Sequence, residues 1–145
     1  MKRNLSYMGY WLIQLTWGCI MTTIGLLAAL CLLVTGHKPY FLGPNMYFIV
    51  GKGWGGVNLG PVFIVSEDSC TRTTLHEAGH GLQNLIWGPL FPFVIAIPSV
   101  IRYCYFNYVW RTDKEKYITL NYDAIWFEGQ ATRWGCKVFL EEMYK

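Results

Sequence analysis

Residues 73–86, TTLHEAGHGLQNLI, decide the fold and the chemistry that the sequence predicts. Thr71, Thr73 or Thr74 can cap a helix here, and Glu77 follows Thr74 by three residues, as in a capping box. Gly88 and Pro89 are typical of a helix end. Apolar residues gather on one side of the stretch and two histidines on the other. The pattern predicts an amphipathic helix over residues 73–86.

His76 and His80 are candidate metal ligands. On a helix, residues four apart lie on one face, so the two imidazoles can bind a single tetrahedral ion. Glu77 lies beside that face and can take a proton from a metal-activated water without binding the metal. The chain has only three histidines, and two of them fall in this HExxH motif. We therefore predict a Zn²⁺ site with Glu77 as the general base.

A catalytic zinc site needs a third protein ligand, and Glu128 is the candidate that we favour. Small residues share its side of a later helix: Ala124, Ala131, Thr132 and Gly135. They would let the two helices approach closely. An ordinary exposed glutamate is the alternative interpretation. His37 lies at the predicted membrane edge, and Asp123 is better placed as a helix N-cap. The remaining acids belong to a charged loop or to the end of a helix: Asp113, Glu115, Glu141 and Glu142.

Two motifs together resemble those of gluzincin metallopeptidases. Residues 76–80 match HExGH, and residues 128–135, EGQATRWG, match ExxAxxxG. The sequence is most similar to HtpX-like membrane-anchored enzymes and to small uncharacterised bacterial gluzincin-like proteins. The resemblance implies a zincin-like domain that hydrolyses peptide bonds, with zinc bound by His76, His80 and Glu128 and with Glu77 as the general base.

The sequence departs from HtpX-like enzymes at Thr132, where they usually carry an aspartate. That acid would orient a metal ligand through a hydrogen bond, and a threonine hydroxyl can accept one without charge. Gln83 shares the face of His76 and His80 and is expected to line the site. Tyr122 and Arg133 are candidate hydrogen-bond donors to a transition state.

Residues 10–35 carry no charge and exceed the ~20 residues that a membrane span needs. Lys2 and Arg3 precede them, and aromatic residues lie at both ends. A cleaved signal peptide is the alternative, but the apolar run is too long and no small-x-small site closes it. We predict one N-terminal transmembrane helix within an anchor at 1–36 and a metallopeptidase domain at 37–145, which we expect on the extracytoplasmic side.

The segment that follows predicts a short sheet. Residues 36–45 contain two prolines and are expected to form a linker. Met46–Val50 and Val57–Val65 are apolar and β-branched, with four glycines between them, so they predict a hairpin or a pair of strands. In the enzymes that the motifs resemble, an edge strand before the HExxH helix pairs with substrate, and Val57–Val65 is placed to do so. A plain core strand is the alternative.

The second half of the chain predicts a broken apolar segment and two further helices. Leu85–Ile101 is uncharged, but three prolines favour an interrupted, interfacial or re-entrant segment over a straight span. Ser99–Arg111 is expected to be helical, and Thr112–Lys116 to be a solvated loop. A last helix, capped by Asn121 or Asp123, is expected to run to about Glu142.

Composition limits the possible functions. Hydrophobic residues make up 53% of the 145 residues and charged residues 14%, which excludes a disordered chain. The net charge of +3 is scattered, which argues against a nucleic-acid partner. We predict an α+β, membrane-anchored zinc metallopeptidase whose partners are a peptide or protein substrate and membrane lipid. The alternatives are a catalytically silent zinc-binding membrane protein and a membrane interaction protein whose working surface is the apolar segment Leu85–Phe106.

Overall fold

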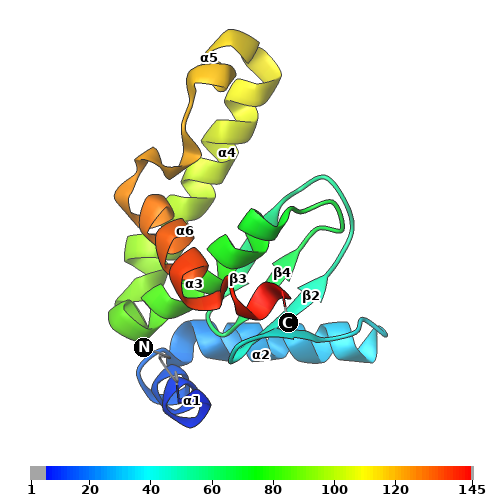
Figure 1. The fold of residues 1–145 in the computed structure, drawn as a ribbon, viewed down its shortest axis with the longest axis vertical. Coiled ribbons are helices and arrows are strands. Elements are labelled where there is room, and N and C mark those ends of the chain that lie inside the picture. Colours follow the sequence, from blue (N-terminus) through cyan, green and yellow to red (C-terminus); the bar gives the residue numbers. More distant parts are fainter. Residues whose placement is uncertain (1–5, 145) are drawn as a thin grey trace.

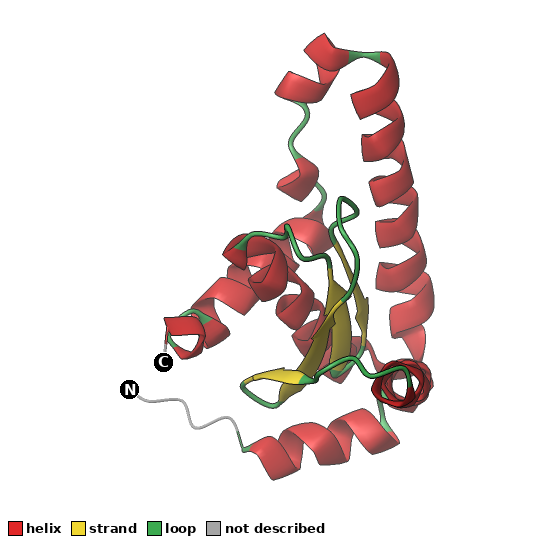
Figure 2. Ribbon diagram, turned by 90° about the vertical axis from the view of Figure 1, so that its right-hand side faces the viewer, coloured by secondary structure: helices red, strands yellow, loops and turns green. Residues whose placement is uncertain are grey.

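The computed structural model describes residues 6–144 and has an α+β fold, as predicted (Figure 1). A mixed sheet of four strands lies between helix α2 (Cys19–Val34) on one face and helix α3 (Thr71–Trp87) on the other. Helix α6 (Trp126–Phe139) packs along α3. Figure 2 shows the long helix α4 (Ile97–Thr112) extending away from the sheet.

The sheet has the strand order β1-β2-β4-β3. Its strands are β1 (Tyr40–Leu42), β2 (Asn45–Ile49), β3 (Gly56–Leu59) and β4 (Val62–Val65). Only β2 and β4 run parallel, and β3 lies at one edge of the sheet. Of the two predicted arrangements, a hairpin between residues 46–50 and 57–65 is wrong, because β2 pairs with β4 in parallel. Residues 57–65 themselves form a hairpin, because Gly60 turns the chain with a φ of +78° and Pro61 follows it. Strand β1 occupies part of the expected linker.

Alternating side chains of β4 build a core on each face of the sheet. Phe63 and Val65 pack toward α3 in a cluster that includes Leu75. Val62 packs toward α2, in a cluster that includes Ala29. This alternation follows from the two-residue period of a strand, and it places α3 against the sheet with its other side free for α6.

The predicted single N-terminal helix is wrong. The chain forms α1 (Tyr7–Thr16) and α2, which meet at an angle of 105°. The break at Trp17 and Gly18 is stabilised by polar groups: the Thr22 hydroxyl donates to the Gln14 and Gly18 carbonyls at 2.8 and 2.9 Å. The Asn84 amide of α3 donates to the Gln14 side chain at 2.5 Å. These bonds tie the break to the body of the protein.

No single helix among residues 6–144 has both the length and the apolar composition to cross a membrane. Two bent pairs of helices satisfy both criteria when each pair is taken together. One is the pair α1 and α2, and the other joins residues 71–90 to residues 92–112 with a bend of 119°. The second bend confirms the prediction that prolines interrupt the apolar segment after residue 85.

Several predicted boundaries change. The predicted threonine cap of α3 is wrong, because the N-cap is Cys70, whose side chain makes no capping hydrogen bond to the helix backbone. The predicted loop 112–116 contains the start of helix α5 (Lys114–Thr119), because Asp113 accepts a hydrogen bond from the Lys116 amide at 3.0 Å and caps it. Helix α6 has no side-chain cap and begins at Trp126.

Candidate metal centre

Helix α3 presents His76 and His80 on one buried face, as their spacing predicted. Their ring nitrogens Nε2 lie 3.1 Å apart, and both side chains are almost fully buried. The opposite face of α3 carries Leu75, Ala78 and Leu82 into the core against the sheet. The amphipathic pattern therefore fixes which way the two imidazoles point.

Helix α6 brings Glu128 to the same place. Its first turn holds Glu128 with no exposed surface, so the interpretation of an exposed helix glutamate is wrong. The two helices approach closely because small residues meet between them, as predicted. A Cβ added to Gly79 would lie 1.9 Å from the Ala131 carbonyl oxygen, so only glycine fits there.

The three predicted ligand atoms converge. The Glu128 Oε2 atom lies 3.0 Å from Nε2 of His76 and 3.3 Å from Nε2 of His80. Oε2 is buried and has no hydrogen-bond partner of good geometry. An orphaned carboxylate oxygen between two imidazoles is costly unless a positive charge satisfies it. This His-His-Glu group can hold a metal ion.

Hydrogen bonds to the outer ring nitrogens leave both Nε2 atoms free to bind a metal. Nδ1 of His80 lies 2.7 Å from the Gln83 side-chain oxygen. The Gln83 amide is oriented by donating to the Phe127 carbonyl at 2.8 Å, so its oxygen must accept from His80. The proton of His80 is then on Nδ1, and Nε2 carries a lone pair. Gln83 thus lines the site, as expected.

The electrostatics of the group favour a cation. Burial by itself would raise the pKa of Glu128, but the adjacent His76 and His80 outweigh burial and hold that pKa well below its ordinary value. Burial would lower the pKa of His80, but the carboxylates of Glu128 and Glu77 raise it. The buried carboxylate and the two imidazoles therefore direct their charge and lone pairs to one point, where a cation is favoured.

Glu77 lies beside the three converging atoms and faces open space. It lines two cavities of about 620 and 480 Å³. Burial raises the pKa of Glu77, and the two histidines offset part of that rise. Strand β3 passes directly over it: a Cβ on Gly56 would lie 2.7 Å from Oε1 of Glu77. The absence of a side chain at position 56 leaves room for the carboxylate.

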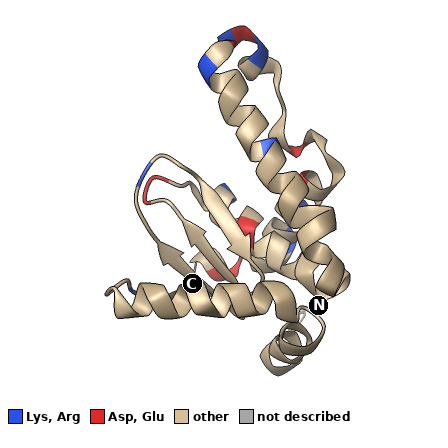
Figure 3. Cartoon of the chain, turned by 180° about the vertical axis from the view of Figure 1, so that it is seen from behind, with Lys and Arg blue, Asp and Glu red and all other residues tan. Residues whose placement is uncertain are grey.

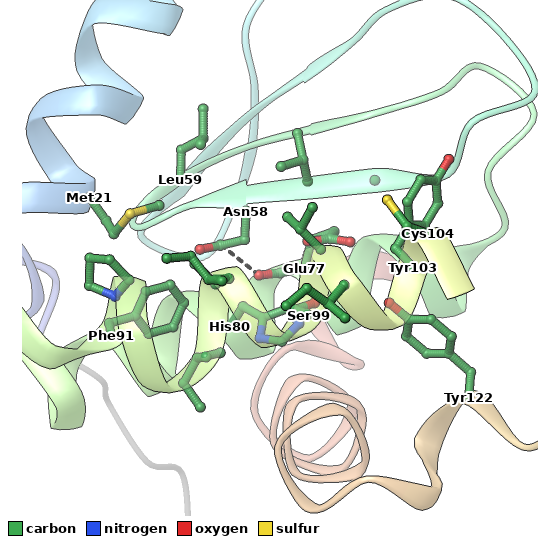
Figure 4. A pocket seen from close by; sticks show the side chains of 18 of the residues that line it. Met21, Asn58, Leu59, Glu77, His80, Phe91, Ser99, Tyr103, Cys104 and Tyr122 are labelled. Carbon is green, nitrogen blue, oxygen red and sulfur yellow. Dashed lines mark hydrogen bonds between the residues drawn. The ribbon is translucent and has the colours of Figure 1, made fainter. Parts of the chain in front are cut away.

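The larger cavity lies between the edge strand β3 and the start of α4 (Figure 4). Asn58 of β3 donates to the Glu77 carbonyl at 2.8 Å, which anchors the edge strand to α3. The walls are mostly apolar and include Met21, Leu59, Phe91, Ile95, Ile97 and Val100. Glu77, His80 and Tyr122 supply polar atoms to the lining. The cleft is therefore apolar away from the candidate metal centre and polar beside it.

Other predicted residues are placed as follows. The Tyr122 hydroxyl lies 3.5 Å from Oε1 of Glu128 and faces both cavities. Arg133 is exposed and lines neither cavity. The other candidate ligands considered lie outside the converging group: His37, Asp113, Glu115, Glu141 and Glu142.

Thr132 and Asp123 show where sequence reasoning succeeded and failed. Thr132 lies 2.8 Å from Nδ1 of His76, which agrees with the role expected at that position. The N-cap role expected of Asp123 is wrong, because its carboxylate accepts a hydrogen bond from Thr132 at 3.1 Å and pairs with Arg72. Gly56 and Asn58 were missed as well. No motif marks them, since their importance depends on the packing of β3 against α3.

Comparison of the chain with family models, curated proteins and solved structures finds no match in any of the three. The resemblance of the two motifs to gluzincins therefore stays a prediction.

Proposed function

We propose that this chain is a membrane-associated, zinc-dependent metallopeptidase of the gluzincin type. The observation that carries the proposal is the convergence of His76, His80 and Glu128, with the Glu77 carboxylate beside them in an open cleft. Two elements distant in the sequence, α3 and α6, build this arrangement together. A structural zinc site is normally closed by four protein ligands, whereas this group supplies three, with an acidic side chain beside them that faces a cavity.

Zinc suits the donor set. Two imidazole nitrogens and one carboxylate oxygen are a common catalytic zinc set that leaves one position open. A tetrahedral ion with ligand bonds of about 2.0–2.1 Å places its ligand atoms about 3.3–3.4 Å apart. The three distances here are 3.0, 3.1 and 3.3 Å. Bound zinc would polarise a substrate carbonyl and lower the pKa of a water molecule toward about 7.

Glu77 is the group that would accept a proton during the reaction. Its raised pKa, caused by burial, brings the carboxylate closer to the range in which a general base works at neutral pH. The close passage of Gly56 restricts where this carboxylate can lie. Glycine at position 56 thereby leaves Glu77 the space that it occupies beside the cleft.

The edge strand β3 is the proposed binding site for the substrate backbone. One side of β3 pairs with β4, and its other side borders the larger cavity beside Glu77. An extended peptide can add to such an edge through main-chain hydrogen bonds. The bond between Asn58 and the Glu77 carbonyl fixes the register of β3 relative to the proposed base. A bound backbone would then pass the candidate metal centre at a defined position.

The side chains around the cleft suggest two further contributions. Burial is the main cause that raises the pKa of Tyr122, and the nearby Glu128 carboxylate raises it further. The Tyr122 hydroxyl therefore keeps its proton and can donate a hydrogen bond to developing negative charge. The apolar wall of the larger cavity fits a bulky apolar side chain next to the bond that is cleaved. We propose peptides with such a residue as the substrates.

Membrane attachment is proposed from the surface of the N-terminal helices. Residues 7–34 carry no charge, and Leu27, Leu30 and Val34 point outward, with more than half of each side chain exposed. Figure 3 shows Lys, Arg, Asp and Glu residues at the far end of α4 and on the loop between β2 and β3, whereas helices α1 and α2 carry none. An apolar face of this kind is unusual in water and is typical of contact with lipid.

Metal analysis and peptide cleavage on one preparation test the proposal. The full chain, purified in detergent, is expected to hold one zinc per chain and to cleave a peptide library, whereas His80→Ala should hold less zinc. Zinc binding without cleavage under varied conditions would favour the catalytically silent metal-binding protein. Absence of any bound metal would favour a membrane interaction protein.

A further inference from the structure

The hydroxyl of Thr132 bridges a candidate metal ligand and a carboxylate that belongs to neither sequence motif. Its oxygen lies 2.8 Å from Nδ1 of His76 and 3.1 Å from Oδ1 of Asp123. Arg72, in the first turn of α3, pairs with the other oxygen of Asp123. The chain of contacts thus runs from the candidate metal centre to the surface through four side chains.

The direction of these hydrogen bonds follows from the groups involved. An ionised carboxylate can only accept, so the single hydroxyl hydrogen of Thr132 goes to Asp123. The Thr132 oxygen is then left with lone pairs, and it accepts the N–H of His76 at Nδ1. This places the His76 proton on Nδ1 and leaves the lone pair on Nε2, which faces Glu128.

We propose that Asp123, acting through Thr132, is a positioning residue that holds His76 in the tautomer able to bind the metal. The negative charge of Asp123 reaches His76 through the Thr132 hydroxyl, whereas a carboxylate at position 132 would contact His76 directly. Arg72 pairs with the other carboxylate oxygen of Asp123 and so fixes the position of this side chain. This inference rests on the proposed metal centre, because His76 must be a ligand for its tautomer to matter.

Removal of Asp123 has a consequence that simple packing does not predict. In Asp123→Ala, the Thr132 hydroxyl is free to rotate and donate to Nδ1 of His76. The imidazole proton then moves to Nε2, where it competes with the metal. A purely structural role for Asp123 would loosen the loop before α6 without changing which nitrogen of His76 is protonated.

Two measurements on the full chain in detergent test this. The first is the zinc dissociation constant, obtained by competition with a chromogenic chelator. The second is the tautomer of His76 in metal-free protein, obtained from ¹⁵N chemical shifts and assigned with His76→Ala. The variants are Thr132→Val, Asp123→Ala and the double variant T132D/D123A, with Thr112→Val as a matched control on the exposed end of α4.

Thr132→Val and Asp123→Ala are each expected to weaken zinc binding about 10- to 100-fold, the usual effect of losing such a partner. Asp123→Ala should also shift His76 toward the form protonated on Nε2. The double variant T132D/D123A gives His76 a carboxylate acceptor directly, so it should restore zinc binding to within a few-fold of the parent. Thr112→Val should bind zinc as the parent does.

Zinc binding within twofold of the parent in both single variants would overturn the proposal. So would an unchanged His76 tautomer in Asp123→Ala, or a double variant that is folded like the parent yet binds zinc no better than Asp123→Ala. The proposed function fails separately. If the parent binds zinc through His76 but cleaves no peptide, the peptidase proposal is lost and the positioning role stands.

Discussion

Gly135 of α6 faces the backbone of Leu75 of α3 at a distance that leaves no room for a side chain. A Cβ at position 135 would lie 1.7 Å from the Leu75 carbonyl oxygen. Gly79 stands in the same relation to Ala131 one turn further along. The helices therefore meet backbone to backbone, and this contact carries Glu128 to the two histidines. The candidate metal centre therefore depends on Gly79 and Gly135, which bind no metal but allow the two helices to approach.

Gly135→Ala should push α6 away from α3 and displace Glu128. Overpacking of this kind usually costs about 1–3 kcal/mol of stability. We expect zinc binding to weaken at least ~10-fold, because one of three ligands moves out of place. Chelator competition and thermal unfolding of the metal-free variant measure the two effects.

Gly9→Ala is the control for Gly135→Ala, since a Cβ on Gly9 of α1 meets its nearest atoms at 3.6 Å, an ordinary contact. It should bind zinc as the parent does. If Gly135→Ala also retains the parent's zinc affinity, the close helix contact is not what positions Glu128.

The site could be predicted where its determinants are local. The spacing of His76 and His80 is a property of any helix, and the small residues around Glu128 mark a close helix contact in the sequence itself. Asp123 could not be assigned in this way. Its role depends on Thr132 and Arg72, which reach it from two different helices. A contact between distant segments leaves no periodic signal in the sequence.

The N-terminal region shows the limit of hydropathy. Residues 10–35 have the composition of one continuous helix, yet the chain bends at Gly18. Gln14 and Thr22 are the polar exceptions that stabilise the bend, but each is unremarkable in an apolar run. They matter because Asn84 of α3 donates to Gln14. The bend between α1 and α2 therefore depends on hydrogen bonds to a distant helix, which the composition of residues 10–35 does not reveal.

Glu77→Gln separates catalysis from metal binding. The glutamine keeps the size of the side chain but cannot accept a proton as a base. We expect zinc affinity close to that of the parent and peptide cleavage slower by about 10²–10⁴-fold, the usual contribution of general-base catalysis. A fluorogenic peptide assay and a zinc titration on the same preparations check both numbers.

Glu115→Gln is the matched control for Glu77→Gln, because it removes an exposed carboxylate on α5 far from the motif. It should leave both zinc binding and cleavage unchanged. Cleavage at the parent's rate in Glu77→Gln would remove this residue from the mechanism.

Gly56→Ala tests whether the space that glycine leaves in the edge strand sets the position of the proposed base. The new methyl group would lie 2.7 Å from Oε1 and Cγ of Glu77, so the carboxylate must shift. We expect cleavage to fall at least ~10-fold while zinc binding persists, because Glu77 is not among the converging ligands. Steady-state kinetics beside a zinc titration distinguish this outcome from general unfolding.

A double variant makes the Gly56→Ala prediction sharper. If the methyl group acts by displacing Glu77, adding Gly56→Ala to Glu77→Gln should cost little further activity, since interacting residues are not additive. Fully additive losses would show instead that Gly56→Ala disturbs substrate pairing with β3 directly.

Glu128→Gln addresses the metal ligand and its link to folding. Glu128 is fully buried between two histidines. The glutamine side chain is uncharged, so the variant lacks the negative charge that attracts a cation there. We expect lower zinc occupancy and a smaller rise in Tm on adding zinc than in the parent, because a ligand that binds only the folded state stabilises it. Undiminished zinc occupancy in this variant would mean that the metal lies elsewhere.

The apolar surface of α2 predicts how the chain behaves in cells. No charged side chain interrupts residues 7–34, and the exposed leucines of α2 would otherwise face water. The full chain should therefore stay with membranes after a carbonate wash. The double variant L27E/L30E places two charges on that face and should move much of the protein into the soluble fraction.

Leu140→Glu, which changes an exposed leucine after α6, is the control and should not alter the fractionation. Release of the parent without detergent would contradict membrane attachment, and retention of L27E/L30E would assign it to a surface other than α2.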